Sequence, residues 1–312
     1  MVKRRDFLKT SVVAGIGSAL LASCGGAAKK DIATLDYKVV DAWPKSGDGI
    51  TEVGVTGVTQ LPNGHVLYCG GDVANPIIEL DAEGNLVRKW GGDVITLKHE
   101  VRCLNNKIFI TDIGSHQIHQ FDLDGNLLTS WGIKDEPGTD HQRFNKPTDI
   151  ALAPNGDYYV SDGYKNNRVV CLDTNGKFKF EWGEKGSAHG QFHIPHNIGV
   201  DKDGRVYVAD RKNGRVQVFE YDGKFVTSWD WFSRPFGIFI ANNGNIYVSD
   251  GGADQPQCVH VVTPEGKVVK KIGKTGKAKG EFDIPHSLFV AKDGMMIVAE
   301  GTNKRVQKFV KQ

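Results

Sequence analysis

The sequence predicts an all-β fold, a six-bladed β-propeller whose ring is closed by an N-terminal strand. The main observation is a short apolar motif with a final acidic residue, which recurs along the chain at intervals of 50, 48, 40 and 50 residues. Its copies are Ile108–Asp112, Tyr158–Asp162, Val206–Asp210, Ile246–Asp250 and Met296–Glu300, with a weaker first copy at Val66–Gly70. A period of about 40–50 residues is typical of propeller blades.

Each copy predicts four short strands, as the fourth one illustrates. An apolar strand at 197–201 leads through the Asp203-Gly204 turn to the repeated motif, which is the second strand. The third strand covers 215–219, and another Asx-Gly turn leads to a fourth at 224–229. Asx-Gly pairs tolerate positive φ and favour tight hairpins. The strands are rich in Val, Ile, Tyr and Phe, and no window has a helical period long enough to compete.

The two ends of the chain are predicted to share one blade. The sixth copy begins at Ile284 and stops after its third strand at Val310, whereas Tyr37–Trp43 resembles the fourth strand Lys224–Trp229. We therefore expect the N-terminal strand to complete the last blade, which leaves no open sheet edge between the termini. The propeller domain is predicted to cover residues 35–312.

Residues 1–24 are interpreted as an export signal. Arg4–Lys9 resembles a twin-arginine motif, Val12–Leu21 is apolar, and Leu21–Cys24 resembles a bacterial lipobox in which Cys24 carries the lipid. A plain membrane helix is the alternative, but the apolar run is short for a span. Residues 25–34 would then be a tether. These features predict a protein exported to the periplasm or outer cell envelope and held at the membrane by the lipid on Cys24 alone.

The charge of the chain argues against one class of partner. The formal net charge is +2, and the N-terminal segment contributes four basic residues against one acidic residue, so the remaining chain is near −1. A near-neutral chain with scattered charges is not expected to bind nucleic acid. We expect a monomer whose ligand is a small molecule or a peptide.

The four cysteines beyond the signal segment form no recognisable metal motif. They are Cys69, Cys103, Cys171 and Cys258, and most fall in apolar strand runs. We predict buried free thiols, although an oxidising compartment would permit a disulfide.

Histidine occupies one aligned position in alternate blades. This ring position precedes the last residue of the motif by 14 residues, or 13 in the second blade, and reads Thr56, His99, Thr148, His196, Phe236 and His286. First strands line the channel of a propeller, so alternate blades of a six-fold ring place three imidazoles about 120° apart around one axis. Three imidazoles with an open fourth position suit zinc. One such histidine alone would be read as a core residue, but three at matched positions predict a zinc site.

The other seven histidines follow no such pattern, and we expect them at the surface or in loops. They are His65, His116, His119, His141, His189, His193 and His260.

Two further residues are predicted to lie at the mouth above the metal. The second strand of a blade runs antiparallel to the first, so its end lies beside the start of the first strand. Tyr164 and Arg211 follow directly after second strands in neighbouring blades. A tyrosine with a lowered pKa acts as a general base or acid, and an arginine holds a carboxylate with two parallel hydrogen bonds. The alternative is a pair of ordinary loop residues.

The blade pattern resembles that of NHL-repeat propellers, and several stretches resemble the peptidyl-α-hydroxyglycine α-amidating lyase family in particular. The resemblance spans roughly residues 50–310 and is strongest from 97 to 220. The matching stretches are Phe144–Asp149, Val160–Tyr164, Asn167-Arg168, Trp182–Glu184, Gly190–Phe192, Ile194–His196, Val208–Arg211, Asn213–Gln217 and Phe282–His286.

The resemblance implies a zinc ion on His99, His196 and His286, with Tyr164 as the base and Arg211 beside the substrate carboxylate. It further implies a carbon–nitrogen lyase of the peptidylamidoglycolate lyase type. Such an enzyme cleaves the N–C bond of a carbinolamide and yields a peptide amide and glyoxylate.

The chain departs from the family at two places that concern ligands. The family has a second substrate arginine in the first blade, where this chain reads Cys69-Gly70-Gly71. The identity of the natural substrate therefore stays open. Calcium is a second candidate ion, but Ser287 stands where the family has a ligand aspartate, which argues against it.

Two other functions are weighed against the lyase. One is a non-catalytic NHL-propeller binding protein on the cell envelope, with a structural metal in its channel; the missing first-blade arginine favours it. The other is a propeller that resembles sugar-lactone esterases. Such sites use carboxylate and asparagine ligands, and the sequence suggests no ring of these.

Overall fold

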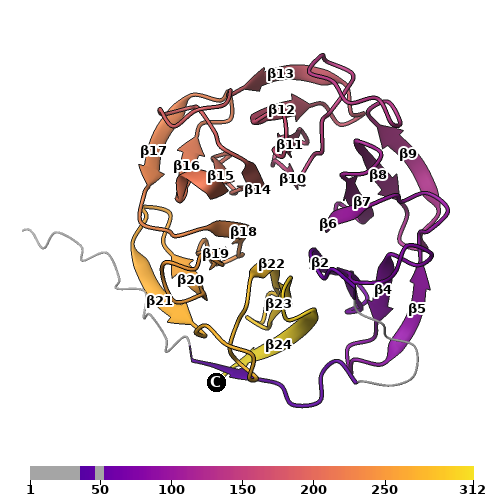
Figure 1. Cartoon of the computed structure of the whole chain (residues 1–312), viewed down its shortest axis with the longest axis vertical. Coiled ribbons are helices and arrows are strands. Elements are labelled where there is room, and N and C mark those ends of the chain that lie inside the picture. Colours follow the sequence, from indigo (N-terminus) through magenta and orange to yellow (C-terminus); the bar gives the residue numbers. More distant parts are fainter. Residues whose placement is uncertain (1–35, 46–52) are drawn as a thin grey trace, which may run out of the picture. The chain divides into compact units, whose positions relative to one another are not determined.

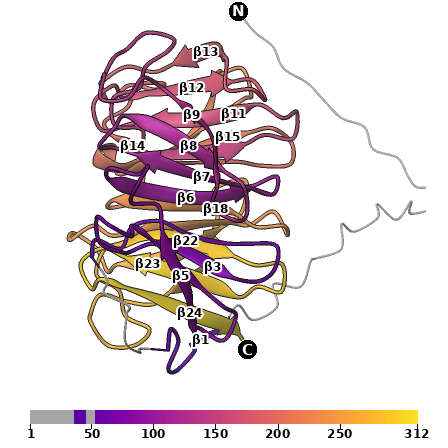
Figure 2. The ribbon, with the colours of Figure 1, turned by 90° about the vertical axis from the view of Figure 1, so that its right-hand side faces the viewer.

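The computed structural model describes residues 36–45 and 53–312, which form a ring of six four-stranded antiparallel sheets (Figures 1 and 2). This confirms the predicted all-β, six-bladed propeller. The predicted signal segment, its lipidation site Cys24 and the tether lie outside the described residues.

Five blades are built from consecutive strands. The first contains β2 (Val58–Gln60), β3 (Val66–Cys69), β4 (Ile77–Leu80) and β5 (Leu86–Trp90). The second contains β6 (Lys98–Leu104), β7 (Lys107–Asp112), β8 (Gln117–Phe121) and β9 (Leu127–Trp131). The third contains β10 (Asp149–Leu152), β11 (Tyr158–Asp162), β12 (Arg168–Leu172) and β13 (Phe178–Trp182). The fourth contains β14 (Pro195–Val200), β15 (Val206–Asp210), β16 (Arg215–Phe219) and β17 (Phe225–Trp229). The fifth contains β18 (Pro235–Ile240), β19 (Ile246–Asp250), β20 (Cys258–Val262) and β21 (Val268–Ile272).

The sixth blade joins the two ends of the chain. It contains β22 (Pro285–Val290), β23 (Met296–Glu300), β24 (Arg305–Lys311) and, as its outer strand, β1 (Tyr37–Val39). Tyr37 pairs with Lys311 and Val39 with Phe309, and the Tyr37 hydroxyl lies 3.1 Å from that of Tyr247 in the fifth blade. Figure 1 shows β1 alongside β24. The predicted closure is confirmed, and β24 is not left as a free edge.

The core lies between neighbouring blades rather than within one sheet. Between the third and fourth blades, for example, Tyr159, Phe192, Val208 and Phe219 are fully buried against one another. Burial of each such side chain contributes about 1.5–3 kcal/mol. Because every blade packs against two others, the ring holds its innermost strands at fixed positions around the channel.

The acidic residue that ends the repeated motif fixes the loop that enters its own blade. Asp210 accepts a hydrogen bond from the backbone N–H of His193 at 2.7 Å and pairs with Arg215 at 2.8 Å. Asp162 accepts in the same way from the N–H of Asn145, and Asp250 from that of Ser233. A carboxylate that accepts backbone N–H bonds stabilises the loop that supplies them. The repeated acid therefore sets where each first strand begins.

Two expectations about buried side chains have different outcomes. Cys69, Cys171 and Cys258 are free and buried, as predicted, whereas Cys103 is free but only partly buried. His119 and His260, however, are buried, so their assignment to the surface was wrong. They stand at the strand position that Gln217 and Gln307 have in the fourth and sixth blades. His119 Nε2 lies 3.3 Å from Asp112 Oδ2, and His260 Nε2 lies 3.6 Å from Asp250 Oδ2.

The described residues hold a single short 3-10 helix, Arg211–Asn213, and no helix long and apolar enough to cross a membrane.

Candidate metal centre

A β-bulge occurs at each ring histidine. The pairing register shifts between Lys98 and Glu100, between Pro195 and Asn197, and between Pro285 and Ser287, so the histidine is in each case the extra residue. A bulged residue leaves the ladder and its side chain is turned from the regular direction, which is why bulges are common next to active sites. The bulges turn His99, His196 and His286 toward one another.

The three imidazoles meet as predicted. Their ring centroids are separated by 4.9 Å (His99–His196), 5.0 Å (His99–His286) and 4.7 Å (His196–His286). One nitrogen of each lies within 4.8 Å of the others, and all three side chains are buried. Nitrogen ligands about 2.0–2.1 Å from a common zinc ion would lie within about 4 Å of one another, so a small inward shift of the rings is needed.

The tautomer of each histidine is fixed by the neighbouring blade. His99 Nδ1 lies 2.7 Å from the Thr148 carbonyl, His196 Nδ1 2.8 Å from that of Phe236, and His286 Nδ1 3.1 Å from that of Thr56. A carbonyl oxygen only accepts, so each Nδ1 must carry the proton and donate it. The three acceptors are the ring positions that lack histidine. Every Nε2 therefore keeps a lone pair for a metal; in metalloproteins, too, a carbonyl that accepts from the other ring nitrogen fixes the tautomer of a ligand histidine.

Burial keeps the three imidazoles neutral. It lowers the pKa of His99 to about 4 and holds the pKa values of His196 and His286 well below the ordinary value. The Arg211 guanidinium adds to the effect on all three. Neutral imidazole is the form that binds metal, so the donor set fits zinc.

Tyr164 lies directly against the histidines. Its hydroxyl oxygen is 3.0 Å from His99 Nε2 and 3.3 Å from His196 Nε2. The preceding residue must be glycine, since a Cβ at Gly163 would lie 1.9 Å from the Pro195 carbonyl oxygen. This close approach lets the loop after β11 cross to the fourth blade and carry Tyr164 over the channel.

Arg211 is part of the same site. Its guanidinium carbon lies 5.4 Å from the centre of the Tyr164 ring and 4.9 Å from that of Phe236. Burial lowers its pKa, and the Tyr164 hydroxyl partly opposes that change. Within the described part of the chain, Arg211 has no ion pair with a carboxylate. The structure thus brings together all five residues that the sequence singled out.

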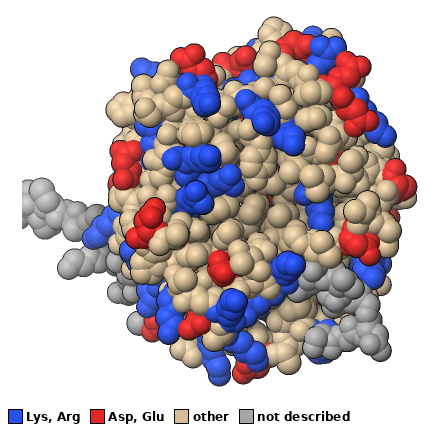
Figure 3. Space-filling view, in the orientation of Figure 1, with Lys and Arg blue, Asp and Glu red and all other residues tan. Residues whose placement is uncertain are grey.

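Other basic side chains near Arg211 also lack a carboxylate partner in the described ranges. Burial lowers the pKa of His193, and Lys212 and Lys185 lower it further, so both lysines lie nearby. Arg234 likewise lowers the pKa of Arg211. Figure 3 shows Lys and Arg side chains gathered over β14–β16 on the face turned to the viewer. The surroundings of the site favour an anionic ligand.

A lysine occupies the side of the site where the first-blade arginine is missing. Lys98 directly precedes His99, and its ammonium donates to the carbonyls of Val53 at 3.0 Å and Gly71 at 2.7 Å. Its pKa is lowered by burial. The Cys69-Gly70-Gly71 stretch therefore contributes the Gly71 carbonyl here and no cation of its own.

A second ring, in which four of the six residues have polar side chains, follows directly after the ring positions, and sequence reasoning missed it. Its members are Gly57, Glu100, Asp149, Asn197, Gly237 and Ser287. Arg102, from β6, lies inside this ring. Its Nε donates to Asp149 Oδ1 at 2.9 Å, and its Nη2 donates to Asp149 Oδ2 at 2.8 Å and to Asn197 Oδ1 at 3.0 Å. The signal that would have found the ring is the alignment of the residue after each ring position.

The sequence suggested no ring of carboxylates and asparagine, and the second ring shows that this expectation was wrong. Glu100, Asp149 and Asn197 do converge, but the Arg102 guanidinium occupies the centre as their cation. Burial raises the pKa of Glu100 to about 8, and Arg102 opposes this rise.

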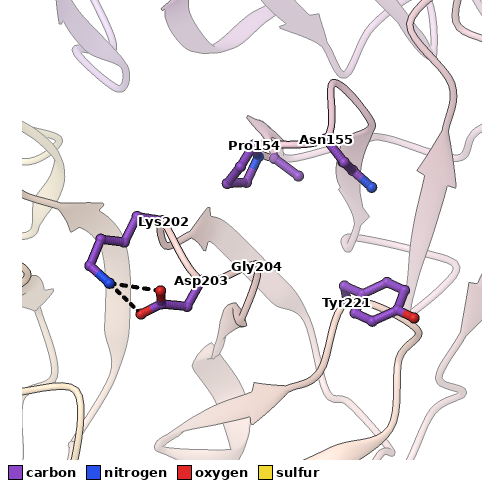
Figure 4. Close-up of a pocket in the computed structure, with 7 residues that line it drawn as sticks. Pro154, Asn155, Lys202, Asp203, Gly204 and Tyr221 are labelled. Carbon is purple, nitrogen blue, oxygen red and sulfur yellow. Dashed lines mark hydrogen bonds and ion pairs between the residues drawn. The ribbon is translucent and has the colours of Figure 1, made fainter.

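A separate pocket of about 290 Å³ is formed by turns of the third and fourth blades (Figure 4). It is lined by Ala153–Asn155, Lys202–Gly204 and Tyr221, and the Lys202 ammonium is paired with Asp203 at 2.6 Å. None of the five site residues lines it, so it does not belong to the metal centre.

Comparisons with known sequences agree with this picture. A model of the NHL repeat matches residues 144–172 and 192–219. Peptidylglycine alpha-amidating monooxygenase of Rattus norvegicus is 33% identical over 72% of this chain. A probable peptidyl-alpha-hydroxyglycine alpha-amidating lyase of Caenorhabditis elegans is 31% identical over 73% of this chain and 67% of that protein. NHL repeat-containing protein 3 of Homo sapiens is 28% identical over 88% of this chain and 84% of that protein.

Solved structures show the same fold. A streptogramin B lyase superposes with a TM-score of 0.64 over 88% of this chain and 98% of that one, at 16% identity. A putative gluconolactonase superposes with a TM-score of 0.65 over 90% of this chain and 93% of that one, at 14% identity. At such identities the likeness concerns the fold alone.

Fold and site together define an NHL-repeat β-propeller with a three-histidine centre in its channel. The chain belongs to the family that includes the peptidyl-α-hydroxyglycine α-amidating lyases. It spans about a quarter of the length of the amidating monooxygenases that it matches.

Proposed function

We propose that this protein is a zinc-dependent lyase that cleaves the N–C bond of a peptidyl-α-hydroxyglycine-like carbinolamide to an amide and glyoxylate. The observation that carries the proposal is the convergence of three neutral imidazoles, with the Tyr164 hydroxyl 3.0 Å from His99 Nε2. Metal ligands, a proton-transfer group and an unpaired guanidinium thus meet at one place. A binding propeller would need no such group beside its metal.

His99, His196 and His286 would hold the ion through Nε2. A zinc ion there would supply Lewis acidity toward the substrate hydroxyl. The fourth position stays open, because no fourth histidine, cysteine or carboxylate joins the group in the described residues. This is the ligand count of catalytic rather than structural zinc sites.

Tyr164 would move the proton that the reaction requires. In the lyase reaction the O–H and C–N bonds of the carbinolamide break, a C=O bond forms, and the amide nitrogen gains the proton. A metal held by the three histidines would take the Nε2 lone pairs that the Tyr164 hydroxyl contacts, which would leave this hydroxyl available to the substrate. The Arg211 guanidinium carbon lies 5.4 Å from the centre of the Tyr164 ring, and a hydroxyl placed between the metal ligands and this cation suits the roles of general base and then acid.

Arg211 would bind the carboxylate that becomes part of glyoxylate. A guanidinium matches a carboxylate with two parallel hydrogen bonds. Arg211 is held by the rings of Tyr164 and Phe236, which leaves its N–H groups without a carboxylate in the described chain. This placement fixes the substrate relative to the proton-transfer group.

The test combines metal analysis with glyoxylate release from α-hydroxyhippurate. We expect about one zinc per chain and glyoxylate production in the wild type, and loss of both in His196→Ala. His189→Ala is the control, since His189 is exposed and outside the ring; it should keep zinc and activity. Glyoxylate production by zinc-free His196→Ala would refute the proposal.

A second candidate function is a non-catalytic binding propeller with a structural metal. It is favoured by the match to NHL repeat-containing protein 3, which extends over more of the chain than the lyase matches. Zinc without any glyoxylate release would select it.

A further inference from the structure

We propose that Phe236 is a positioning residue that determines the preference of the site for carboxylate ligands, because its ring holds the Arg211 guanidinium beside the three histidines. The inference rests on the proposed role of Arg211 in the lyase reaction and names a residue on which that role depends. The Phe236 side chain has no hydrogen-bonding group, so it acts through Arg211 and not on the ligand itself.

Phe236 occupies the ring position of the fifth blade, between the histidine positions of the fourth and sixth blades. Like the histidines, it is the extra residue of a β-bulge, because the pairing register shifts between Pro235 and Gly237. Its ring centroid lies 5.1 Å from that of His196 and 5.4 Å from that of His286. The side chain is buried, and the backbone carbonyl lies 2.8 Å from His196 Nδ1. The benzene ring is therefore one wall of the histidine cluster.

The same ring contacts Arg211 of the fourth blade. The guanidinium carbon lies 4.9 Å from the Phe236 centroid and 5.4 Å from the Tyr164 centroid. A cation within about 6 Å of an aromatic centroid is attracted by the ring, most strongly where water is excluded. Unlike a carboxylate, a benzene ring supports the guanidinium without neutralising its charge. The cation therefore keeps its attraction for a carboxylate ligand.

Two residues at equivalent positions of neighbouring blades bring the ring and the guanidinium together. Arg211 directly follows the acidic residue of the motif in the fourth blade, and Gly251 does so in the fifth. A Cβ added at Gly251 would lie 2.9 Å from Cδ2 and from Cε2 of Phe236, which is too close for the ring to stay in place. Glycine in the fifth blade thus makes room for the ring, and the long side chain of the fourth blade reaches it.

The experiment measures the binding of hippurate and of hippurate methyl ester by isothermal titration calorimetry, in protein supplied with zinc. Hippurate has the carboxylate but no α-hydroxyl, so it reports recognition without turnover. Phe236→Leu keeps an apolar side chain and removes the aromatic ring. It should weaken hippurate binding about 5-fold or more, the factor for loss of a partly desolvated cation–π contact. Affinity for the ester should change by less than about 2-fold, since no carboxylate meets Arg211.

Phe232→Leu is the matched control. Phe232 lies just before the same blade, is 5% exposed like Phe236, and stacks on Trp231 instead of Arg211. The two substitutions remove the same atoms from buried rings, so both should lower the melting temperature and both should leave the zinc content unchanged. Only Phe236→Leu should change the ratio of the hippurate and ester affinities. An unchanged ratio in Phe236→Leu, or an equal change in Phe232→Leu, would overturn the inference.

Gly251→Ala provides a second test if Phe236→Leu does not fold. Its methyl group must displace the Phe236 ring, so it should also reduce the preference for hippurate over the ester. The same preference as in the wild type would contradict the proposed role of Phe236.

Failure of the inference and failure of the lyase proposal give different results. Preferential hippurate binding that depends on Phe236, without glyoxylate release from α-hydroxyhippurate, would refute the lyase and leave the role of Phe236 standing. Glyoxylate release together with a wild-type affinity ratio in Phe236→Leu would refute the role of Phe236 alone. Equal binding of hippurate and its ester by the wild type would refute carboxylate recognition by Arg211, and the inference with it.

Discussion

The hydroxyl oxygen of Tyr164 lies 3.0 Å from Nε2 of His99, although the two residues are 65 positions apart and belong to different blades. Ring closure places the proposed proton-transfer group against a proposed metal ligand. Substitutions at the two residues can therefore test metal binding and turnover independently.

Tyr164→Phe should keep zinc and lose turnover. The phenyl ring preserves the packing against Arg211 and the three histidines stay intact, whereas the group that transfers the proton is gone. We expect kcat for glyoxylate release to fall about 10²–10⁴-fold, the range for a lost general acid or base. Zinc content measured by atomic absorption should match the wild type. Wild-type turnover in this variant would exclude Tyr164 from the chemistry.

Arg211→Gln should impair recognition of carboxylate substrates specifically. Loss of a buried charged hydrogen-bond partner costs about 2 kcal/mol or more, so kcat/KM for α-hydroxyhippurate should fall about 30-fold or more. For the methyl ester of the same substrate, kcat/KM should fall much less. Arg234→Gln is the control, because Arg234 is near but exposed. An equal loss for acid and ester would argue against carboxylate binding by Arg211.

Asp112→Asn should destabilise the second blade in a pH-dependent way. Burial would raise the Asp112 pKa, but hydrogen bonds from His119 and from the N–H groups of Thr96 and Leu97 outweigh it and lower the pKa. A depressed carboxyl pKa stabilises the fold above the unfolded value near 4, and that stability is lost as pH falls below it. We expect a loss of about 3 kcal/mol at pH 7.

Urea unfolding at several pH values checks this prediction. The difference between wild type and Asp112→Asn should shrink as pH falls below about 4. The exposed Asp124→Asn should stay within about 0.5 kcal/mol at all pH values. A difference that is the same at pH 7 and pH 3 would assign the effect to packing rather than to the charge.

Removal of β1 should open the ring. A chain that begins at Val40 loses the pairs of Tyr37 and Val39 with β24 and the contact of Tyr37 with Tyr247. Its melting temperature should fall by about 5 °C or more, since each kcal/mol of lost stability lowers the melting temperature by about 2–4 °C in a domain of this size. The bared edge of β24 should also promote association, visible by light scattering. A chain that begins at Thr34 is the control.

Much of the fold could be predicted because the repeat is nearly regular. Recurrence of the motif every 40–50 residues from Ile108 onward gives the blades, and the likeness of the Tyr37 segment to a fourth strand gives the closure. The convergence of His99, His196 and His286 could be predicted from the same alignment. His119 and His260 were misplaced because their acidic partners lie on the adjacent strand, and strand pairing is not visible in a list of histidine positions.

The sequence by itself determined the period of the chain, the number of blades and the presence of histidine at every second ring position, because these are matters of spacing along one dimension. Only the tertiary structure decided how side chains meet across the channel. The bulges that turn the imidazoles inward, the carbonyls that fix their tautomers and the Glu100 contact with Ser287, 187 residues away, all depend on neighbours that ring closure supplies. Contacts of this kind join strands of different blades, so no local pattern in the chain encodes them.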